Sequence, residues 1–212
     1  MSTPQERRND LLAQKLINSL GKRNISGYFC KTGEDALKKA LELIKEGSTV
    51  TWGGGMTLRD TGIAKTLIEG NYEVYDRDAC PDAASLEECM RKAFFVDWYV
   101  SGINGLSEDG QIVNVDGRGN RVAAITFGPK QVLFITGLNK VTQDLDSAIK
   151  RARSTAAPMN NQRFDTPTPC HIDGVCHNCT LLECICNYVH ILRNTNVPGK
   201  YHVILVDECL GF

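Results

Sequence analysis

Five of the nine cysteines crowd into one short segment, residues 165–190. Four of them follow the spacing Cys170-x5-Cys176-x2-Cys179-x6-Cys186. A Cys-x2-Cys pair presents two thiolates from one tight turn, and flanking cysteines can complete a four-sulfur cage. Because thiolates favour soft metals, the segment predicts an iron-sulfur cluster of the 4Fe-4S kind or a zinc ion.

The residues of this segment do not decide between zinc and an iron-sulfur cluster. His171 and His177 could replace a cysteine at zinc, whereas an all-cysteine set serves either centre. Cys184 lies inside the last interval and is either a spare thiol or the fourth ligand in place of Cys186. Unligated thiols and a purely structural zinc are the alternatives. Because crowded cysteines in a reducing compartment more often bind metal than form disulfides, we expect a metal centre, and we favour the iron-sulfur cluster.

Three consecutive glycines form a second candidate site. Gly53, Gly54 and Gly55 follow an expected strand, and Thr57 with Asp60 caps an expected helix directly after them. Backbone N–H groups of such a loop and helix start converge on one point, which suits a phosphate or a carboxylate. The spacing matches neither the dinucleotide fingerprint nor the P-loop. The loop therefore predicts a small-anion site, with a sharp strand-to-helix connection as the alternative.

A second polar group, Asn114, Asp116, Asn120 and Arg121, lies in a glycine-rich turn after another strand. Arg121 could bind a carboxylate or phosphate through two parallel hydrogen bonds. Asp116 could instead hold its turn, and Asn120 could cap the helix that follows. Loops of this kind gather at the C-terminal ends of strands in an open α/β sheet, and convergence with the glycine loop would favour the ligand role.

Strands and helices alternate along the chain, which predicts a mostly parallel sheet flanked by helices in a single α/β domain over residues 1–212. Capping residues and apolar spacing predict helices that include 12–20, 57–70 and 144–157, and one to residue 95 capped by Ser85 and Glu88. A hairpin with a strand at 111–115 interrupts the alternation, and 158–169 has loop composition. The expected strands of the sheet are 25–30, 48–52, 72–75, 96–100, 131–136 and 201–206.

Composition narrows the class of protein. The chain has 212 residues and 42% hydrophobic content, so it can bury a full core without disulfides. Its 24 basic and 25 acidic residues nearly cancel, which offers no broad electrostatic footprint for nucleic acid. No apolar run approaches the ~20 residues that span a bilayer, and the first residues lack the apolar stretch of a signal peptide. We expect a cytoplasmic protein that binds neither nucleic acid nor membrane.

Several segments together resemble the lactate-utilisation (LUD) domain family. Residues 49–57 resemble its glycine loop, and 114–122 resemble its second signature. Residues 156–160, the cysteine spacing and 202–206 resemble the stand-alone subfamily with a C-terminal cysteine cluster. The resemblance implies a fold like that of phosphosugar isomerases and CoA transferases, with a cysteine-rich C-terminal extension. It also implies an association with the oxidation of L-lactate to pyruvate beside iron-sulfur subunits.

The turn from Ser107 to Gly110 resembles the Ser-Glu-x-Gly turn that carries the nucleophilic glutamate of CoA transferases. On that resemblance, Glu108 could attack an acyl group or act as a general base. A glutamate in an exposed turn is more often only solvated.

Three functions stay open from the sequence. The first is a redox-linked subunit or accessory protein in lactate or 2-hydroxy acid utilisation, which binds a small anionic metabolite and an iron-sulfur cluster. It needs a redox partner, because the chain has no flavin or nicotinamide fingerprint. The second is a metabolite-binding or regulatory module with a structural zinc. The third is acyl transfer through Glu108.

Overall fold

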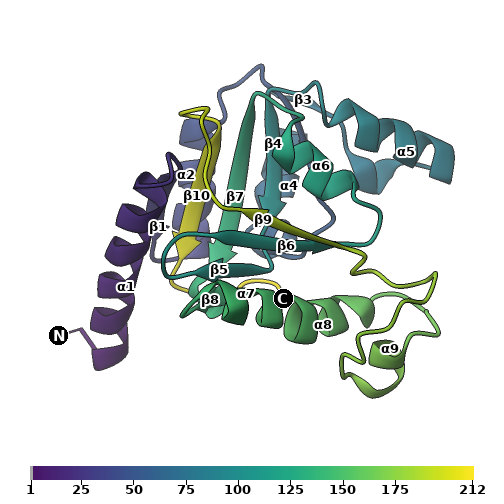
Figure 1. Ribbon diagram of the computed structural model, residues 1–212. Coiled ribbons are helices and arrows are strands. Elements are labelled where there is room, and N and C mark those ends of the chain that lie inside the picture. The colour runs from purple at the N-terminus through teal and green to yellow at the C-terminus, as the bar shows by residue number, and fades with distance from the viewer. Residues whose placement is uncertain (1) are drawn as a thin grey trace.

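A six-stranded parallel sheet forms the centre of the computed structural model, which describes residues 2–212 (Figure 1). All five neighbouring strand pairs are parallel, which confirms the predicted fold class. In spatial order, the strands are β1 (Ser26–Cys30), β10 (Tyr201–Val206), β7 (Gln131–Gly137), β4 (Trp98–Gly102), β2 (Thr49–Trp52) and β3 (Glu73–Val74).

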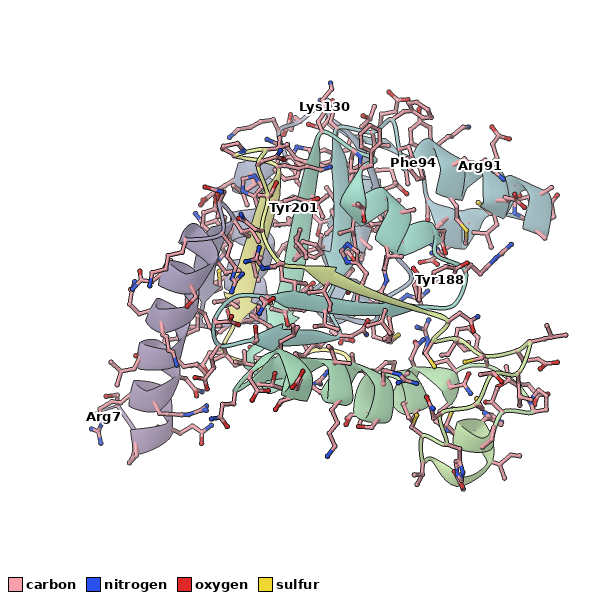
Figure 2. The ribbon with its side chains drawn as sticks, viewed as in Figure 1. Arg7, Arg91, Phe94, Lys130, Tyr188 and Tyr201 are labelled. Carbon is pink, nitrogen blue, oxygen red and sulfur yellow. The ribbon has the colours of Figure 1, made fainter. Side chains whose placement is uncertain are left out.

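Helices cover both faces of this sheet because successive strand residues point to opposite sides. On β7, Val132 and Phe134 pack in one core with α1 and α6, while Leu133 and Ile135 pack in another with α2, α3 and α4. The Tyr201 hydroxyl donates to the Ile125 carbonyl at 2.8 Å and ties α6 to β10 (Figure 2). The covering helices are α1 (Pro4–Gly21), α2 (Gly33–Leu43), α3 (Thr57–Asp60), α4 (Ile63–Glu69), α5 (Ala83–Lys92) and α6 (Asn120–Thr126).

A second, smaller sheet lies beside the first and includes the predicted hairpin. Val113 and Val115 of its strand β6 pack on alanines of the helical segment beneath it (Figure 1). The sequence did not predict its edge strand β9, because three of the five β9 residues are exposed and the strand follows the loop-like cysteine segment. In spatial order, the strands are β8 (Val141–Thr142), β5 (Gly105–Ser107), β6 (Ile112–Asp116) and β9 (Tyr188–Leu192).

Two predicted helices are wrong in detail. The expected helix 57–70 is broken between α3 and α4, where Gly62 adopts φ +70°, a left-handed conformation that ends a helix. The glycine loop is therefore followed by a single helical turn. So short a helix adds little to the attraction of an anion, which weakens the prediction that the helix start helps to bind one there. The cap of α5 is Asp82, which accepts from the Ser85 backbone N–H at 2.8 Å, and not the pair Ser85 and Glu88.

The expected helix 144–157 continues further than predicted. It consists of α7 (Leu145–Arg151), a π-helical turn (Ala152–Ala156) and α8 (Ala157–Asn161). A proline lacks an N–H and crowds the carbonyl one turn earlier, so it usually ends a helix. The wider π turn lies directly before Pro158 and accommodates it, which is why the loop begins after residue 161 and not at 158. Over residues 2–212, no helix combines the length and apolarity that crossing a membrane requires.

Candidate functional site

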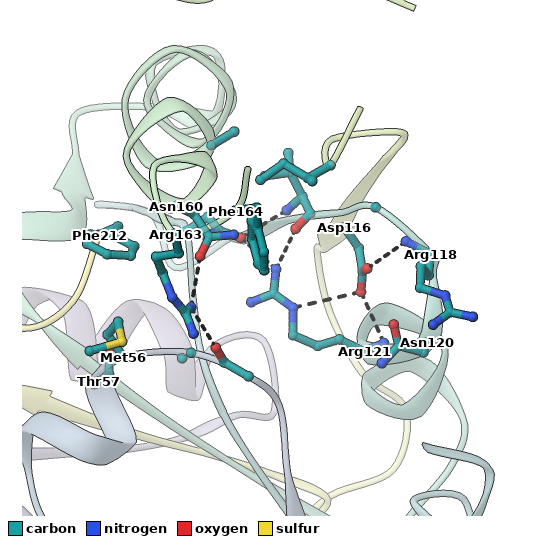
Figure 3. A pocket seen from close by; sticks show the side chains of 18 of the residues that line it. Met56, Thr57, Asp116, Arg118, Asn120, Arg121, Asn160, Arg163, Phe164 and Phe212 are labelled. Carbon is teal, nitrogen blue, oxygen red and sulfur yellow. Dashed lines mark hydrogen bonds and ion pairs between the residues drawn. The ribbon is translucent and has the colours of Figure 1, made fainter. Parts of the chain in front are cut away.

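A cavity of about 590 Å³ opens where the glycine loop, the start of α6 and the turn after α8 meet. Figure 3 shows Met56, Thr57 and Phe212 at one end of it and Asp116, Arg118 and Asn120 at the other. Its basic lining residues outnumber its acidic ones. The basic residues are Arg77, Arg118, Arg121, Lys140 and Arg163, and the acidic ones are Asp78 and Asp116.

The structure brings most of the predicted ligand residues together. Gly53 and Asn114 do not line the cavity. Gly53 instead gives space to Arg121, since a Cβ at residue 53 would lie 3.1 Å from the Arg121 Cδ atom. Asn114 is fully buried on β6, and its side-chain amide finds no hydrogen-bond partner within residues 2–212. The predicted residues that do line the cavity are Gly54, Gly55, Thr57, Asp116, Asn120 and Arg121.

Asp116 holds the turn that starts α6. Its carboxylate accepts hydrogen bonds at 3.0–3.2 Å from the backbone N–H groups of Arg118, Gly119, Arg121 and Val122. Four donors saturate most of the acceptor capacity of one carboxylate. Asp116 therefore holds this turn by capping its free backbone N–H groups, and holding the turn is the alternative that the sequence left open for it.

Two arginines approach the glycine loop from other elements. Arg77 lies in a 3-10 turn (Arg77–Ala79) after β3, and a Cβ at Gly54 would lie 3.4 Å from its guanidinium carbon. The Arg77 Nε atom is buried without a hydrogen-bond partner in residues 2–212, and it lies 3.9 Å from an Asp78 oxygen. Arg163 donates to the Gly54 carbonyl at 2.9 Å (Figure 3). The loop is thus lined by cations that sequence spacing did not single out.

Arg121 spans the space between α6 and β6. Its Nη2 atom donates to the Asn104 side-chain oxygen at 2.8 Å and to the Val115 carbonyl at 2.5 Å. Its Nε atom lies 3.8 Å from the Asp116 carboxylate. These bonds fix the guanidinium at the cavity wall and leave its remaining donor capacity for a ligand.

Lys140 is a site residue that the sequence analysis missed. It ends a 3-10 turn (Leu138–Lys140) after β7, is only 3% exposed, and lines the cavity. Its Nζ atom donates to the Thr57 hydroxyl at 3.3 Å. Burial, with help from the nearby charges of Arg151 and Arg121, lowers the pKa of Lys140 to about 7, while Asp60 acts in the opposite direction. The available signal was a lysine just past the end of a central strand.

The last residues of the chain cover this lysine. The Gly211 N–H donates to the Asp60 carboxylate at 3.0 Å, and Phe212 lines the cavity. Gly211 has φ +55°, and a Cβ there would lie 2.6 Å from the Thr57 hydroxyl and 3.2 Å from the Lys140 Nζ atom. A glycine is therefore required where the chain crosses Thr57 and Lys140.

The cysteine segment begins with α9 (Pro169–Asp173) and projects beyond α8 (Figure 1). The sulfurs of Cys184 and Cys186 lie 3.3 Å apart. Burial and the neighbouring thiols of Cys184 and Cys176 raise the pKa of Cys186 to about 12. Burial also raises the pKa of Cys179, with smaller effects from Cys184 and Cys170. All five thiols therefore have at least one other thiol nearby.

The arrangement of these thiols bears on the kind of metal centre. Within residues 2–212, no three His, Cys, Asp or Glu side chains are placed to hold one metal ion. A structural zinc needs its sulfurs at ~2.3 Å from a single point, whereas a cluster distributes its cysteines over several irons. The candidate ligands are all cysteine thiolates, and soft thiolates are the ligands that iron-sulfur clusters prefer.

Contacts join the cysteine segment to the cavity. Ile185, between the two neighbouring thiols, lines the cavity. The Asn187 amide donates to the Gly117 carbonyl at 3.0 Å, so the segment packs on the turn that Asp116 holds. At the other end, the buried Asn161 amide contacts the Cys170 sulfur at 3.4 Å. The segment therefore contributes Ile185 to the lining of the cavity.

Glu108 lies elsewhere. It occupies the turn between β5 and β6, and its carboxylate pairs with Lys15 of α1 at 2.5 Å. It does not line the cavity described above. Any reaction at Glu108 would have to use a different surface and displace Lys15.

Comparison with known proteins agrees with the fold. A DUF162 family protein from Deinococcus radiodurans has a similar structure, with TM-score 0.51 and 10% identity over 93% of this chain and 96% of that chain. The eIF2B beta structure from Chaetomium thermophilum shares 13% identity, with TM-score 0.36, over 52% of this chain and 43% of that one. No curated protein matches the sequence. Residues 13–206 match the LUD domain, and the chain therefore belongs to the LUD domain family.

Proposed function

We propose that the cavity binds a small organic anion of the 2-hydroxy acid or 2-oxo acid class. The observation that carries this proposal is the excess of basic over acidic side chains around one cavity. The carboxylate of Asp116, one of the two acids, already accepts hydrogen bonds from four backbone donors. A volume of about 590 Å³ suits a small ligand with room for ordered water. Membership of the LUD family supports a role in lactate utilisation.

Arg77 is the residue best placed to reveal such binding. Its guanidinium lines the cavity and faces the glycine loop, where both terminal nitrogens lie near Gly54 and could donate to a ligand carboxylate. Arg121 and Arg163 already donate to backbone carbonyls, so their loss would also disturb the walls of the cavity.

Titration calorimetry with pyruvate and with L-lactate tests the proposal. Losing a charge-assisted hydrogen bond costs about 1.5–3 kcal/mol, so Arg77→Gln should weaken binding about tenfold to a hundredfold. Arg91→Gln is the matched control, because Arg91 is exposed on α5 and, within residues 2–212, its ion pair is with Glu87. Absence of binding to the unaltered protein, or equal affinities for the two variants, would refute the site.

A second proposal concerns the cysteines. We propose that Cys170, Cys176 and Cys179, with Cys186 or Cys184 as the fourth ligand, hold an iron-sulfur cluster beside the anion. When bound, such a cluster supplies one-electron transfer, so the chain would work as a redox-linked subunit with a protein partner. The position of Ile185 in the cavity wall supports this, because it brings the sulfur segment next to the ligand. The resemblance to the stand-alone subfamily with a cysteine cluster also supports an iron-sulfur cluster at these residues.

Purification without air, followed by iron and acid-labile sulfide analysis, tests the cluster. We expect both elements in the unaltered protein and in Cys209→Ser, because Cys209 is exposed and lies outside the segment. Cys176→Ser should lose them. Zinc without sulfide would instead favour the regulatory alternative, and protein free of both metals would refute metal binding.

A further inference from the structure

We propose that Lys140 is a nucleophile that forms an imine with the carbonyl group of a 2-oxo acid bound in the cavity. This inference rests on the proposed function, because it needs an organic anion at that site. It also narrows the ligand class, since a 2-hydroxy acid has no carbonyl carbon for an amine to attack beside its carboxylate.

The position of Lys140 is unusual for a lysine. The side chain is 3% exposed, yet it lines a cavity. Among residues 2–212 its amine forms no ion pair with a carboxylate, and its hydrogen bond goes to the Thr57 hydroxyl. A buried amine without an acidic partner destabilises a fold, and such groups cluster at functional sites.

The surroundings of this amine disfavour its charged form. Arg121 of α6 and Arg151 of α7 add positive charge, and Asp60 of α3 is the acidic group that opposes them. Asp60 is itself engaged by the Gly211 N–H. A neutral amine contributes little to attracting an anion, whereas it is the form that attacks a carbonyl carbon.

Different side chains of the cavity are available to bind the carboxylate of a 2-oxo acid and to attack its carbonyl carbon. Arginines at the glycine loop and at α6 can bind its carboxylate, while the amine comes from the end of β7. In the step, the Nζ lone pair forms a C–N bond and the carbonyl π electrons move to oxygen. One of the two Nζ protons then passes to that oxygen, which gives a neutral carbinolamine. Loss of that hydroxyl and of the nitrogen-bound proton as water leaves the C=N bond, so no oxidant or reductant is consumed.

Reductive trapping tests the inference. The intact protein is incubated with pyruvate and sodium borohydride, and the adduct is located by peptide mass spectrometry. We expect one adduct per chain, with the mass of pyruvic acid less one oxygen atom, on the peptide that contains Lys140. Lys140→Arg should lose at least nine-tenths of it, whereas Lys150→Arg, an exposed position on α7, should keep it.

The outcomes separate this inference from the proposed function. If calorimetry shows pyruvate binding but no adduct forms, the imine is refuted and the anion site stands. If pyruvate neither binds nor reacts, both fail. An adduct spread over exposed lysines, unchanged in Lys140→Arg, also refutes the imine. Should Lys140→Arg not fold, the adduct position mapped in the unaltered protein decides alone.

Discussion

Replacing Lys140 by methionine should change how stability depends on pH. The pKa of Lys140 falls from its ordinary value of 10.5 to about 7 because its ammonium is buried beside Arg151 and Arg121, with only partial relief from Asp60. At about 1.4 kcal/mol per pH unit, that fall corresponds to a cost of about 5 kcal/mol for holding the charge in the folded chain. Local rearrangement that lets water reach the ammonium lowers the cost, so we expect about 2–5 kcal/mol.

The sign of the effect follows from proton linkage. Between pH ~7 and ~10.5 the unfolded chain keeps the Lys140 proton and the folded chain releases it, so the stability of the unaltered protein rises with pH across that window. Below pH ~7 both states are protonated and the full cost is present. Lys140→Met removes the free-energy cost of burying the ammonium. The free energy of unfolding of this variant should therefore exceed that of the unaltered protein by the largest amount below pH ~7, and the excess should shrink as pH rises.

Urea unfolding of both proteins from about pH 6 to pH 10 measures this difference. Methionine adds a constant contribution from its own packing, so the informative quantity is the change with pH. Lys150→Met serves as the control, because Lys150 is exposed and should show a difference that does not vary with pH. If the difference in free energy of unfolding between Lys140→Met and the unaltered protein stays constant or grows with pH, the lowered pKa of Lys140 is refuted.

Three further predictions follow from contacts outside Lys140. Asp116→Ala removes the acceptor for four backbone donors and should destabilise the fold by about 2–4 kcal/mol in urea unfolding, and a loss below ~1 kcal/mol would contradict the capping role. Asn161→Leu releases Thr168 and Cys170, so limited proteolysis within 165–190 should become faster, and unchanged cleavage would contradict the anchoring role. Glu108→Gln should change stability by less than ~1 kcal/mol, because its pair with Lys15 is partly exposed. If the protein has any CoA-dependent acyl transfer, that variant should abolish it, and intact activity would end the nucleophile hypothesis.

Much of the fold could be predicted because it depends on local patterns. Alternating strands and capped helices predicted the central parallel sheet, and β10 begins and ends where its apolar run does. Features that depend on partners distant in sequence were missed. Strand β9 exists because β6 offers it an edge, and Pro158 fits a helix because the preceding turn is π-helical.

The candidate site divides in the same way. The glycine loop and the 114–121 turn carry recognisable signatures, and both reach the cavity. Arg77 and Lys140 carry none, because their roles depend on sheet order, which places the ends of β3 and β7 around the same space. For Asp116 the local pattern allowed a turn-holding or a ligand role, and only the four backbone donors distinguish the two roles.

A crystal structure of the protein grown with saturating pyruvate, under conditions that keep the thiols reduced, is the decisive test of anion binding in the cavity. We expect an anion in the cavity, with its carboxylate within hydrogen-bond distance of the Arg77 or Arg121 guanidinium. A cavity that contains only solvent at saturating pyruvate, or an anion bound on another surface, would contradict this expectation.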